Sequence, residues 1–324
     1  MNVRESKMKS FRTGGTLAWV GLVLGAIFGP NPVHGLEKVR IGLSVRNVVF
    51  LPFYYAKDKK IFEKHGLDSE LIQMRSDLQM VGLVSGELDF NPAIGPATLA
   101  IAGGMPLKAV AVFYRAPLFS LVSPASLASL KELEGKRVAV SRLGSDSHRY
   151  GVMMMEQSGV DVKKVTFIQS GSTTVSLTAL QQGSVAAAVL SPPFTGAMAE
   201  KGYKVLAKSR SLLDLPWLGL VTSRQKIEKQ PERVKSVLRA MREALESIRA
   251  DRQGVVAYIE KNFNVNQTVA TESYEDLRGV LVDGLMMPEE QIKKYLEGAH
   301  ARGELPKPLS FGDAFDFSAL KSLK

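Results

Sequence analysis

An internal repeat constrains the fold of this chain more than any other feature of its sequence. Two short apolar runs that each end in serine, residues 38–44 and 137–141, have the composition of buried strands. Three pairs of landmarks share one offset of 97 residues: Ser44 and Ser141, Gly86 and Gly183, and Pro96 and Pro193. A constant offset indicates a duplicated structural unit. The chain is therefore expected to fold into two similar halves.

Each copy shows the same order of elements, namely strand, helix, strand, helix, strand. The first copy is expected to have a strand at 38–44, a helix at 52–64 stopped by Gly66, a strand at 69–73, a helix from Ser76 or Asp77 to Gly86, and a strand at 88–90. Leu78, Val81 and Val84 are expected to face the core from the second of these helices. The second copy is expected to have a strand at 138–141, a helix through 153–156, a strand at 164–168, a helix at 173–182 and a strand at 185–190.

Strands that alternate with helices predict parallel sheets with right-handed connections, whose post-strand loops share one edge. Residues 107–114 and 119–122 are expected to be strands that cross from one lobe to the other, and residues 218–222 are expected to cross back. After this return, an amphipathic helix begins at Pro231 and opens a helical region at 224–324. We expect this region to cover the first lobe.

These elements predict an α/β fold with two lobes, each a mainly parallel sheet flanked by helices, joined by two crossover strands that act as a hinge. The first lobe is expected to comprise residues 36–117 and 220–324, and the second lobe residues 118–219. Residues 1–35 are expected to stand outside both lobes.

The first 35 residues have the three-part layout of a secretory signal. Four basic side chains precede an apolar stretch at 17–28, and small residues follow as far as Gly35. The apolar stretch is shorter than the roughly 20 residues that span a bilayer, so cleavage near Gly35 is expected. The chain has no cysteine, which excludes a lipid-anchored form, disulfides and thiolate metal sites. The mature protein is therefore expected to be soluble and extracytoplasmic, in a periplasm or its equivalent.

Charge and histidine placement argue against several classes of function. The formal net charge is +10, but lysine and arginine alternate with acidic residues along helical segments such as 232–252, so a nucleic-acid surface is not expected. His65, His148 and His300 lack metal-ligand spacing, and neither a nucleophile elbow nor a phosphate-binding glycine loop occurs. We expect no enzyme activity, no metal and no cofactor.

Several segments resemble the ABC-transporter substrate-binding proteins of the nitrate/sulfonate/taurine type. They are PFYYAKDKKIFEKHGLD at 52–68, LVSGELD at 83–89, GMPLKAV at 104–110, LKELEGKRV at 130–138 and GSVAAAVLSPP at 183–193. The resemblance covers most of residues 36–210 and implies a periplasmic binding protein of type II fold. It also implies delivery of a captured solute to a membrane permease in a transient complex, with the binding protein itself expected to be a monomer.

Two departures from related patterns bear on this resemblance. Family members carry an aspartate in the second copy that matches Asp89, whereas the segment at 183–186 lacks it. Because that position is expected to be structural, its loss does not weaken the expectation of binding. Pyrimidine-synthesising enzymes that share the fold use a cysteine-containing motif, which this chain cannot supply. The resemblance therefore favours transport over catalysis.

Loops that follow the strands of both lobes are expected to line a shared cleft, where helix N-termini suit anions. Arginines in these loops would pair with a carboxylate or sulfonate, and Phe50 and Phe194 would line an apolar wall. The hydroxyl side chains of the second lobe could instead be helix caps. The predicted ligand-binding residues are Ser44, Arg46, Asn47, Phe50, Asn91, Ile94, Gly95, Thr98, Arg115, Ser141, Arg142, Gly144, Ser145, Ser147, Ser172, Thr173, Pro193 and Phe194.

The predicted function is capture of a small anionic organic solute, such as a sulfonate or carboxylate, by closure of the two lobes. A ligand-sensing module that presents its bound form to a membrane receptor would have the same fold and stays open as an alternative. An enzyme that uses the same cleft is the least favoured alternative, because no catalytic motif supports it.

Overall fold

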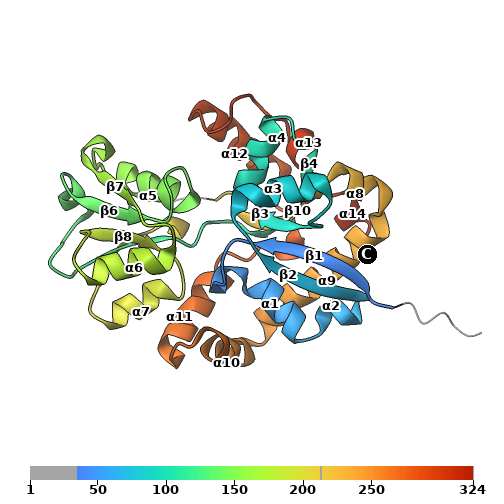
Figure 1. Ribbon diagram of the computed structural model, residues 1–324, viewed down its shortest axis with the longest axis horizontal. Helices are drawn as coiled ribbons and strands as arrows, with labels where there is room; N and C mark the ends of the chain where they lie inside the picture. The colour runs from blue at the N-terminus through green and yellow to red at the C-terminus, as the bar shows by residue number, and fades with distance from the viewer. Residues whose placement is uncertain (1–34, 212–213, 324) are drawn as a thin grey trace, which may run out of the picture. The chain divides into compact units, whose positions relative to one another are not determined.

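The computed structural model describes residues 35–211 and 214–323. The predicted export signal lies almost entirely at residues 1–34, outside the described residues. Leu36–Lys324 forms one compact unit, and Figure 1 shows its two sets of sheets and helices. The predicted fold class, α/β with two lobes, is confirmed.

The first lobe is built on parallel pairing of the two strands that open the repeat. Strand β1 (Glu37–Leu43) pairs with β2 (Leu67–Gln73) along its whole length. A bridge from Ile41 to Phe90 joins β1 to the segment that enters β3 (Asn91–Ala93). Strand β10 (Leu218–Ser223) lies between β3 and β4 (Leu107–Tyr114) and is antiparallel to both. The returning chain thus forms the centre of a separate antiparallel sheet, so the expectation of one mainly parallel sheet in this lobe is wrong.

Helices lie above and below the strands of the first lobe in the view of Figure 1. Those that follow the first strands are α1 (Leu51–Asp58), α2 (Ile61–Lys64), α3 (Ser76–Ser85) and α4 (Ile94–Ala102). The predicted helix at 52–64 is broken because Lys60 adopts a left-handed conformation, with φ of 57°. The C-terminal helices are α8 (Arg224–Lys229), α9 (Pro231–Ala250), α10 (Arg252–Phe263), α11 (Gln267–Arg278), α12 (Glu289–Ala301), α13 (Phe311–Ala314) and α14 (Ser318–Lys321).

The second lobe contains one five-stranded sheet in the order β7-β6-β8-β5-β9. Its strands are β5 (Ser120–Ser123), β6 (Arg137–Val140), β7 (Thr166–Gln169), β8 (Ala187–Leu190) and β9 (Lys204–Lys208). Strand β6 runs parallel to β7 and β8, whereas β5 is antiparallel to β8 and β9. The accompanying helices are α5 (Asp146–Gln157), α6 (Thr173–Gln181) and α7 (Phe194–Glu200).

The repeat is visible in the backbone of the two lobes. Asp89 donates its N–H to the Arg40 carbonyl at 2.8 Å, and Ala186, 97 residues later, donates to the Arg137 carbonyl at 2.9 Å. Helix α3 ends at Gly86 with φ of 83°, and Gly183, after α6, has φ of 68°. Glycine suits both positions because left-handed φ is costly for residues with a Cβ. Equivalent residues therefore make equivalent backbone contacts.

The prediction that Leu78, Val81 and Val84 face the core is wrong. Their exposed fractions are 53%, 56% and 41%, and α3 instead buries Met80 and Leu83. The rotation of the helix follows from Gln79, which is buried because its amide group donates to the Met74 carbonyl and accepts from Asn91. A polar residue whose hydrogen bonds are satisfied can lie on the core face of a helix. A prediction from the spacing of apolar residues overlooks such a residue.

Each face of the second-lobe sheet has its own apolar cluster. Val138 and Val140 of β6 face the cluster that includes Met154 and Met155 of α5, whereas Ala139 faces the cluster with Leu180 of α6. This alternation is the period of two expected of a strand. Tyr150 of α5 packs into the first-lobe core instead. That tyrosine marks one place where the two lobes are in direct contact.

The chain passes between the two lobes twice, in the segment that joins β4 to β5 and in the segment that leads into β10. The predicted limits of the lobes, at residues 117 and 118 and at residues 219 and 220, stay predictions. Both connecting segments run close to each other near Arg115 and Asp214, whose side chains are paired.

Candidate functional site

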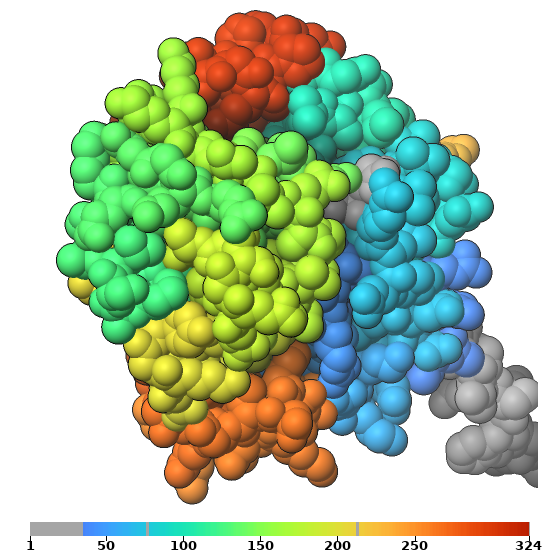
Figure 2. Space-filling model, turned by 60° about the vertical axis from the view of Figure 1, so that its left-hand side comes forward, coloured from blue at the N-terminus to red at the C-terminus, as the bar shows by residue number. Residues whose placement is uncertain are grey.

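A hydrogen bond between two post-strand loops joins the lobes. Asn47 follows β1 and caps the short helix Val48–Phe50, because its Oδ1 accepts the Val49 N–H at 2.9 Å. Its Nδ2 donates across the lobes to Ser191 Oγ at 2.9 Å, and both residues are buried. Ser191 directly follows β8. Figure 2 shows the surface of the second lobe, in green to yellow, against that of the first lobe, in blue to cyan.

The direction of these bonds fixes the chemistry of the contact. The Val49 N–H orients the Asn47 amide, so that its NH₂ group must face Ser191. Ser191 Oγ then acts as the acceptor, and its own hydrogen has no acceptor among the described residues. The Asn47 amide also keeps a second N–H. The contact therefore presents donors, which suit an anionic or carbonyl oxygen.

Three hydroxyl groups form a second polar cluster in the loop after β6. Ser141 Oγ lies 2.8 Å from Ser147 Oγ and 3.2 Å from Ser145 Oγ, and Ser145 and Ser147 are 3.0 Å apart. Ser145 donates to the Arg142 carbonyl at 2.7 Å, and Ser147 accepts the backbone N–H of Ser141 at 3.0 Å. Ser145 occupies the N-cap position of α5 without a side-chain cap bond. By contrast, Ser172 caps α6 by accepting the Val175 N–H.

The loop after β3 is held by amide and hydroxyl groups that are already paired. Asn91 donates to Gln79 and accepts the Ala93 N–H at 2.6 Å. Thr98 donates to the Gly95 carbonyl at 2.8 Å and lies 3.2 Å from the phenol oxygen of Tyr295 on α12. These residues fix the shape of the loop, and their hydrogen-bonding capacity is largely used.

A charged bridge crosses between the lobes beside this loop. Asp146 Oδ2 accepts the indole N–H of Trp217 at 2.9 Å, and Arg149 lies 3.1 Å from Glu304 and 3.9 Å from Asp146. A Cβ on Gly95 would lie 3.7 Å from the Arg149 guanidinium, an ordinary van der Waals contact, so this approach does not require glycine. Burial alone would lower the pKa of Arg149, but the two carboxylates raise it overall. The arginine therefore remains charged between them.

Two predicted arginines lie away from these contacts. Arg46 is exposed, stacks over Tyr54 with 4.8 Å from its Cζ to the ring centroid, and donates to the Asn262 carbonyl at 3.4 Å. Arg115 leaves β4 and holds Asp214 with two hydrogen bonds. Neither guanidinium faces the pair of Asn47 and Ser191 through any contact in the described part of the chain.

The other predicted residues take varied positions. Phe50 and Ile94 are buried in the first-lobe core, Ser44 is exposed after β1, and Pro193 follows a cis peptide bond. Arg142 and Gly144 lie on the exposed side of the loop after β6, and Thr173 and Phe194 are half-buried in the first turns of α6 and α7.

His148 lies next to the hydroxyl cluster without joining it. Its Nδ1 accepts the Gly144 N–H at 3.1 Å, and its ring meets Phe167 edge to face, with 4.6 Å between centroids. Burial lowers the pKa of His148. The imidazole is therefore neutral at pH 7, and its acceptor nitrogen is used by the backbone.

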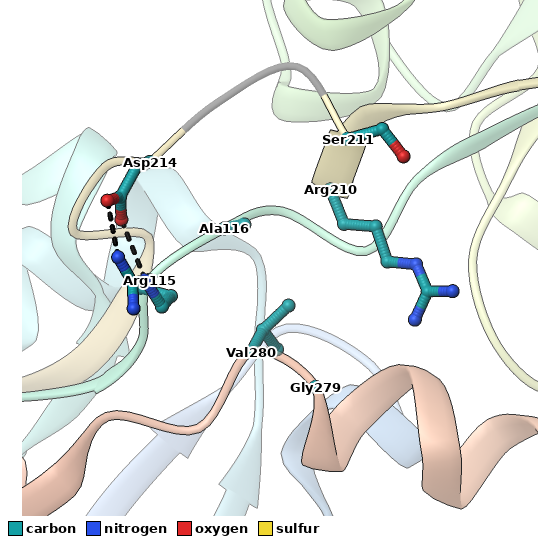
Figure 3. Close-up of a pocket in the computed structure, with 7 residues that line it drawn as sticks. All are labelled: Arg115, Ala116, Arg210, Ser211, Asp214, Gly279 and Val280. Atoms are coloured by element: carbon teal, nitrogen blue, oxygen red, sulfur yellow. Dashed lines mark hydrogen bonds and ion pairs between the residues drawn. The ribbon is translucent and has the colours of Figure 1, made fainter.

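A separate pocket of about 420 Å³ lies beside the connections between the lobes (Figure 3). Arg115 and Asp214 point toward each other across one end of it, and Arg210 points away from that pair. Arg210 is bound to Asp276 at 2.8 Å. Both arginines already hold carboxylates, so their charges are balanced without a ligand.

Sequence reasoning missed several residues at the contact between the lobes. Ser191 stands two positions before the predicted Pro193, and Asp146 stands inside the predicted run of serines, so both lay within reach of the same argument. Tyr295 and Glu304 come from the C-terminal helical region, which the sequence presented only as a cover for the first lobe. Local sequence gives no signal that they approach α4 and α5.

The described residues show neither a metal-binding cluster nor a membrane-spanning helix. Across residues 35–211 and 214–323, no group of three or more His, Asp or Glu side chains is arranged to hold a metal ion. No helix in the described part of the chain is long and apolar enough to cross a membrane.

Two α/β lobes that meet at their post-strand loops define the fold of the periplasmic binding proteins. The chain belongs to the NMT1/THI5-like family, whose sequence model matches residues 47–254. The resemblance inferred from sequence is thus confirmed at the level of family and fold. Among curated proteins, no sequence matches the chain.

Solved structures share the fold at low sequence identity. The alkanesulfonate-binding protein SsuA from Xanthomonas axonopodis pv. citri, bound to MOPS, aligns with a TM-score of 0.72 and 20% identity over 86% of this chain and 98% of its own. The periplasmic aliphatic sulphonate binding protein SsuA from Escherichia coli aligns at 0.70 and 20% over 88% and 99%. The periplasmic nitrate-binding protein NrtA from Synechocystis aligns at 0.69 and 14% over 84% and 83%.

Proposed function

We propose that this protein captures a small organic anion, such as a sulfonate or carboxylate, where the two lobes meet, and delivers it to an ABC permease. The main support is the contact of Asn47 with Ser191, in which the Asn47 NH₂ group is oriented as a hydrogen-bond donor toward the second lobe. The similar proteins bind an alkanesulfonate, an aliphatic sulphonate and nitrate, as their names state, and all three are oxygen-bearing anions. Membership of the NMT1/THI5-like family supports a ligand-binding role.

The geometry favours recognition by oriented dipoles over a simple ion pair. The Asn47 amide is locked as a donor, and the Ser191 hydroxyl is free to donate onward. Buried N–H and O–H donors stabilise an anion strongly because water does not compete with them. The hydroxyl cluster at Ser141, Ser145 and Ser147 lies in another post-strand loop of the second lobe. No covalent step is part of the proposal, so the ligand is released unchanged.

A calorimetric screen of ligand-stripped protein tests the binding step. Ethanesulfonate, MOPS, butyrate and nitrate are compared with neutral and cationic solutes of similar size. A ligand at 100 times its Kd should stabilise the protein by about 2.7 kcal/mol. Response to neutral or cationic solutes alone would refute the preference for anions.

An Asn47→Asp variant tests the donor directly. The carboxylate keeps the oxygen that caps Val49 but removes the NH₂ group and adds a negative charge, so anion binding should be lost while the fold is retained. Asn262→Asp is the matched control, because Asn262 makes the same class of bond within α10, to the Tyr258 carbonyl. The control should bind as the unchanged protein does.

Export and delivery require tests in cells. In this proposal, the signal at residues 1–35 is removed near Gly35, and the mature protein acts outside the cytoplasm as a monomer. N-terminal sequencing of the exported protein checks the cleavage site. Deletion of the gene should abolish uptake of the labelled solute. A sensory protein would instead leave uptake unchanged and abolish a transcriptional response to the solute.

A further inference from the structure

Thr195 has a buried hydroxyl group with no hydrogen-bond partner among the described residues. Thr195 is only 4% exposed. The other buried atoms of this kind belong to the guanidinium groups of Arg149, Arg233 and Arg242, which bond through other nitrogens. Thr195 is therefore different, because its single polar side-chain atom is the unpaired one.

Thr195 follows Ser191 by four residues, in the segment that carries the second-lobe side of the candidate site. The Phe194 N–H donates to the Ser191 carbonyl at 3.0 Å, which closes a tight turn and sets Thr195 in the first turn of α7. The next residue, Gly196, approaches α11 of the first lobe so closely that a Cβ there would lie 2.8 Å from Glu272 Oε2. Along the chain, Thr195 thus lies between two residues that contact the first lobe, Ser191 and Gly196.

An unpaired buried hydroxyl destabilises the folded chain, because it gives up hydrogen bonds to water and receives none in return. Valine has nearly the same shape and would avoid this cost. A threonine that is structurally unfavourable next to a ligand contact is the pattern expected of a group that is paired only when the ligand is bound.

We infer that Thr195 is a ligand-binding residue, whose hydroxyl hydrogen bonds to an oxygen of the captured anion together with the donors of Asn47 and Ser191. The inference rests on the proposed function, since it needs an anion at this contact. It adds a residue outside the predicted set and assigns its hydroxyl a role in affinity instead of stability.

Replacement of Thr195 by valine and by serine separates these two roles. Binding of ethanesulfonate, MOPS and butyrate to the mature chain is measured by calorimetry, and stability without ligand is measured by urea unfolding. Thr195→Val should weaken binding about 10- to 100-fold, the range for a hydrogen bond to a charged group, with unfolding stability unchanged or higher. Thr195→Ser keeps the hydroxyl and should bind within about threefold of the unchanged protein.

Thr222→Val is the matched control, because the Thr222 hydroxyl is buried but donates to the Asp89 carbonyl at 2.7 Å. That variant should lose stability and keep its affinity, the opposite of Thr195→Val. Unchanged affinity in Thr195→Val would overturn the inference, as would equal losses in the valine and serine variants. If the unchanged protein bound none of the probes, the proposed function would fail first, and the inference with it.

Discussion

Removal of the Asp89 carboxylate should cost this protein a large part of its stability. Asp89 is 5% exposed and accepts the Arg40 backbone N–H at 2.6 Å. It also pairs with Lys226, which is 9% exposed, and lies 3.3 Å from an Arg233 nitrogen. The carboxylate thereby ties β1 to α8 and α9. In an Asp89→Ala variant, the Lys226 ammonium would remain buried without its counter-ion.

Breaking a buried ion pair from one side costs about 3–5 kcal/mol, because the remaining charge is uncompensated. Urea unfolding followed by circular dichroism measures the loss. Glu70→Gln is the control, since the ion pair of Glu70 with Lys38 is exposed and its loss should leave stability nearly unchanged. Adding Lys226→Met to Asp89→Leu should recover much of the stability. A loss below about 1 kcal/mol in Asp89→Ala would refute this account of the buried pair.

Three further predictions concern other parts of the fold. Burial lowers the pKa of His148, so the neutral imidazole contributes its full stability above the unfolded pKa of about 6.5, and this stability is lost as the pH falls through the folded pKa. His148→Phe should therefore reduce the loss of unfolding free energy that is measured below about pH 6.5. Leu83→Ala should cost about 2–5 kcal/mol in urea unfolding, whereas Leu78→Ala on the exposed face of α3 should cost less than about 0.5 kcal/mol. Trp217→Phe should lower the unfolding free energy by about 1–3 kcal/mol, because the Asp146 carboxylate loses the indole N–H, and chemical denaturation followed by circular dichroism would show it.

The periodicity of apolar residues predicted the buried face of a helix correctly where that face contains only apolar side chains. The α9 residues Val234, Val237, Leu238 and Met241 are all buried, as their spacing predicts. It failed for α3, because Gln79 satisfies its amide inside the fold and turns the apolar residues outward. The left-handed Lys60, which breaks the predicted first helix, is likewise set by local backbone geometry that composition does not encode.

In the candidate site too, some residues were predictable from the local sequence and others were not. Asn47 was predicted because it follows a strand and precedes a helix, and its partner Ser191 occupies the same kind of position in the other lobe. Whether each predicted residue binds ligand stays a prediction. The bridge from Arg149 to Glu304 joins residues far apart in the chain, and only the packing of α12 and its following loop beside α5 brings them together. Spacing within one segment cannot anticipate such contacts.

The paired side chains of Arg115 and Asp214 have a mechanical consequence. One belongs to the segment that leaves the first lobe and the other to the segment that returns to it, so the two connections are fastened to each other at their first-lobe ends. Both side chains are about half exposed, so water weakens this link. The pair therefore marks the place where the two connections lie side by side, and it adds little to their rigidity.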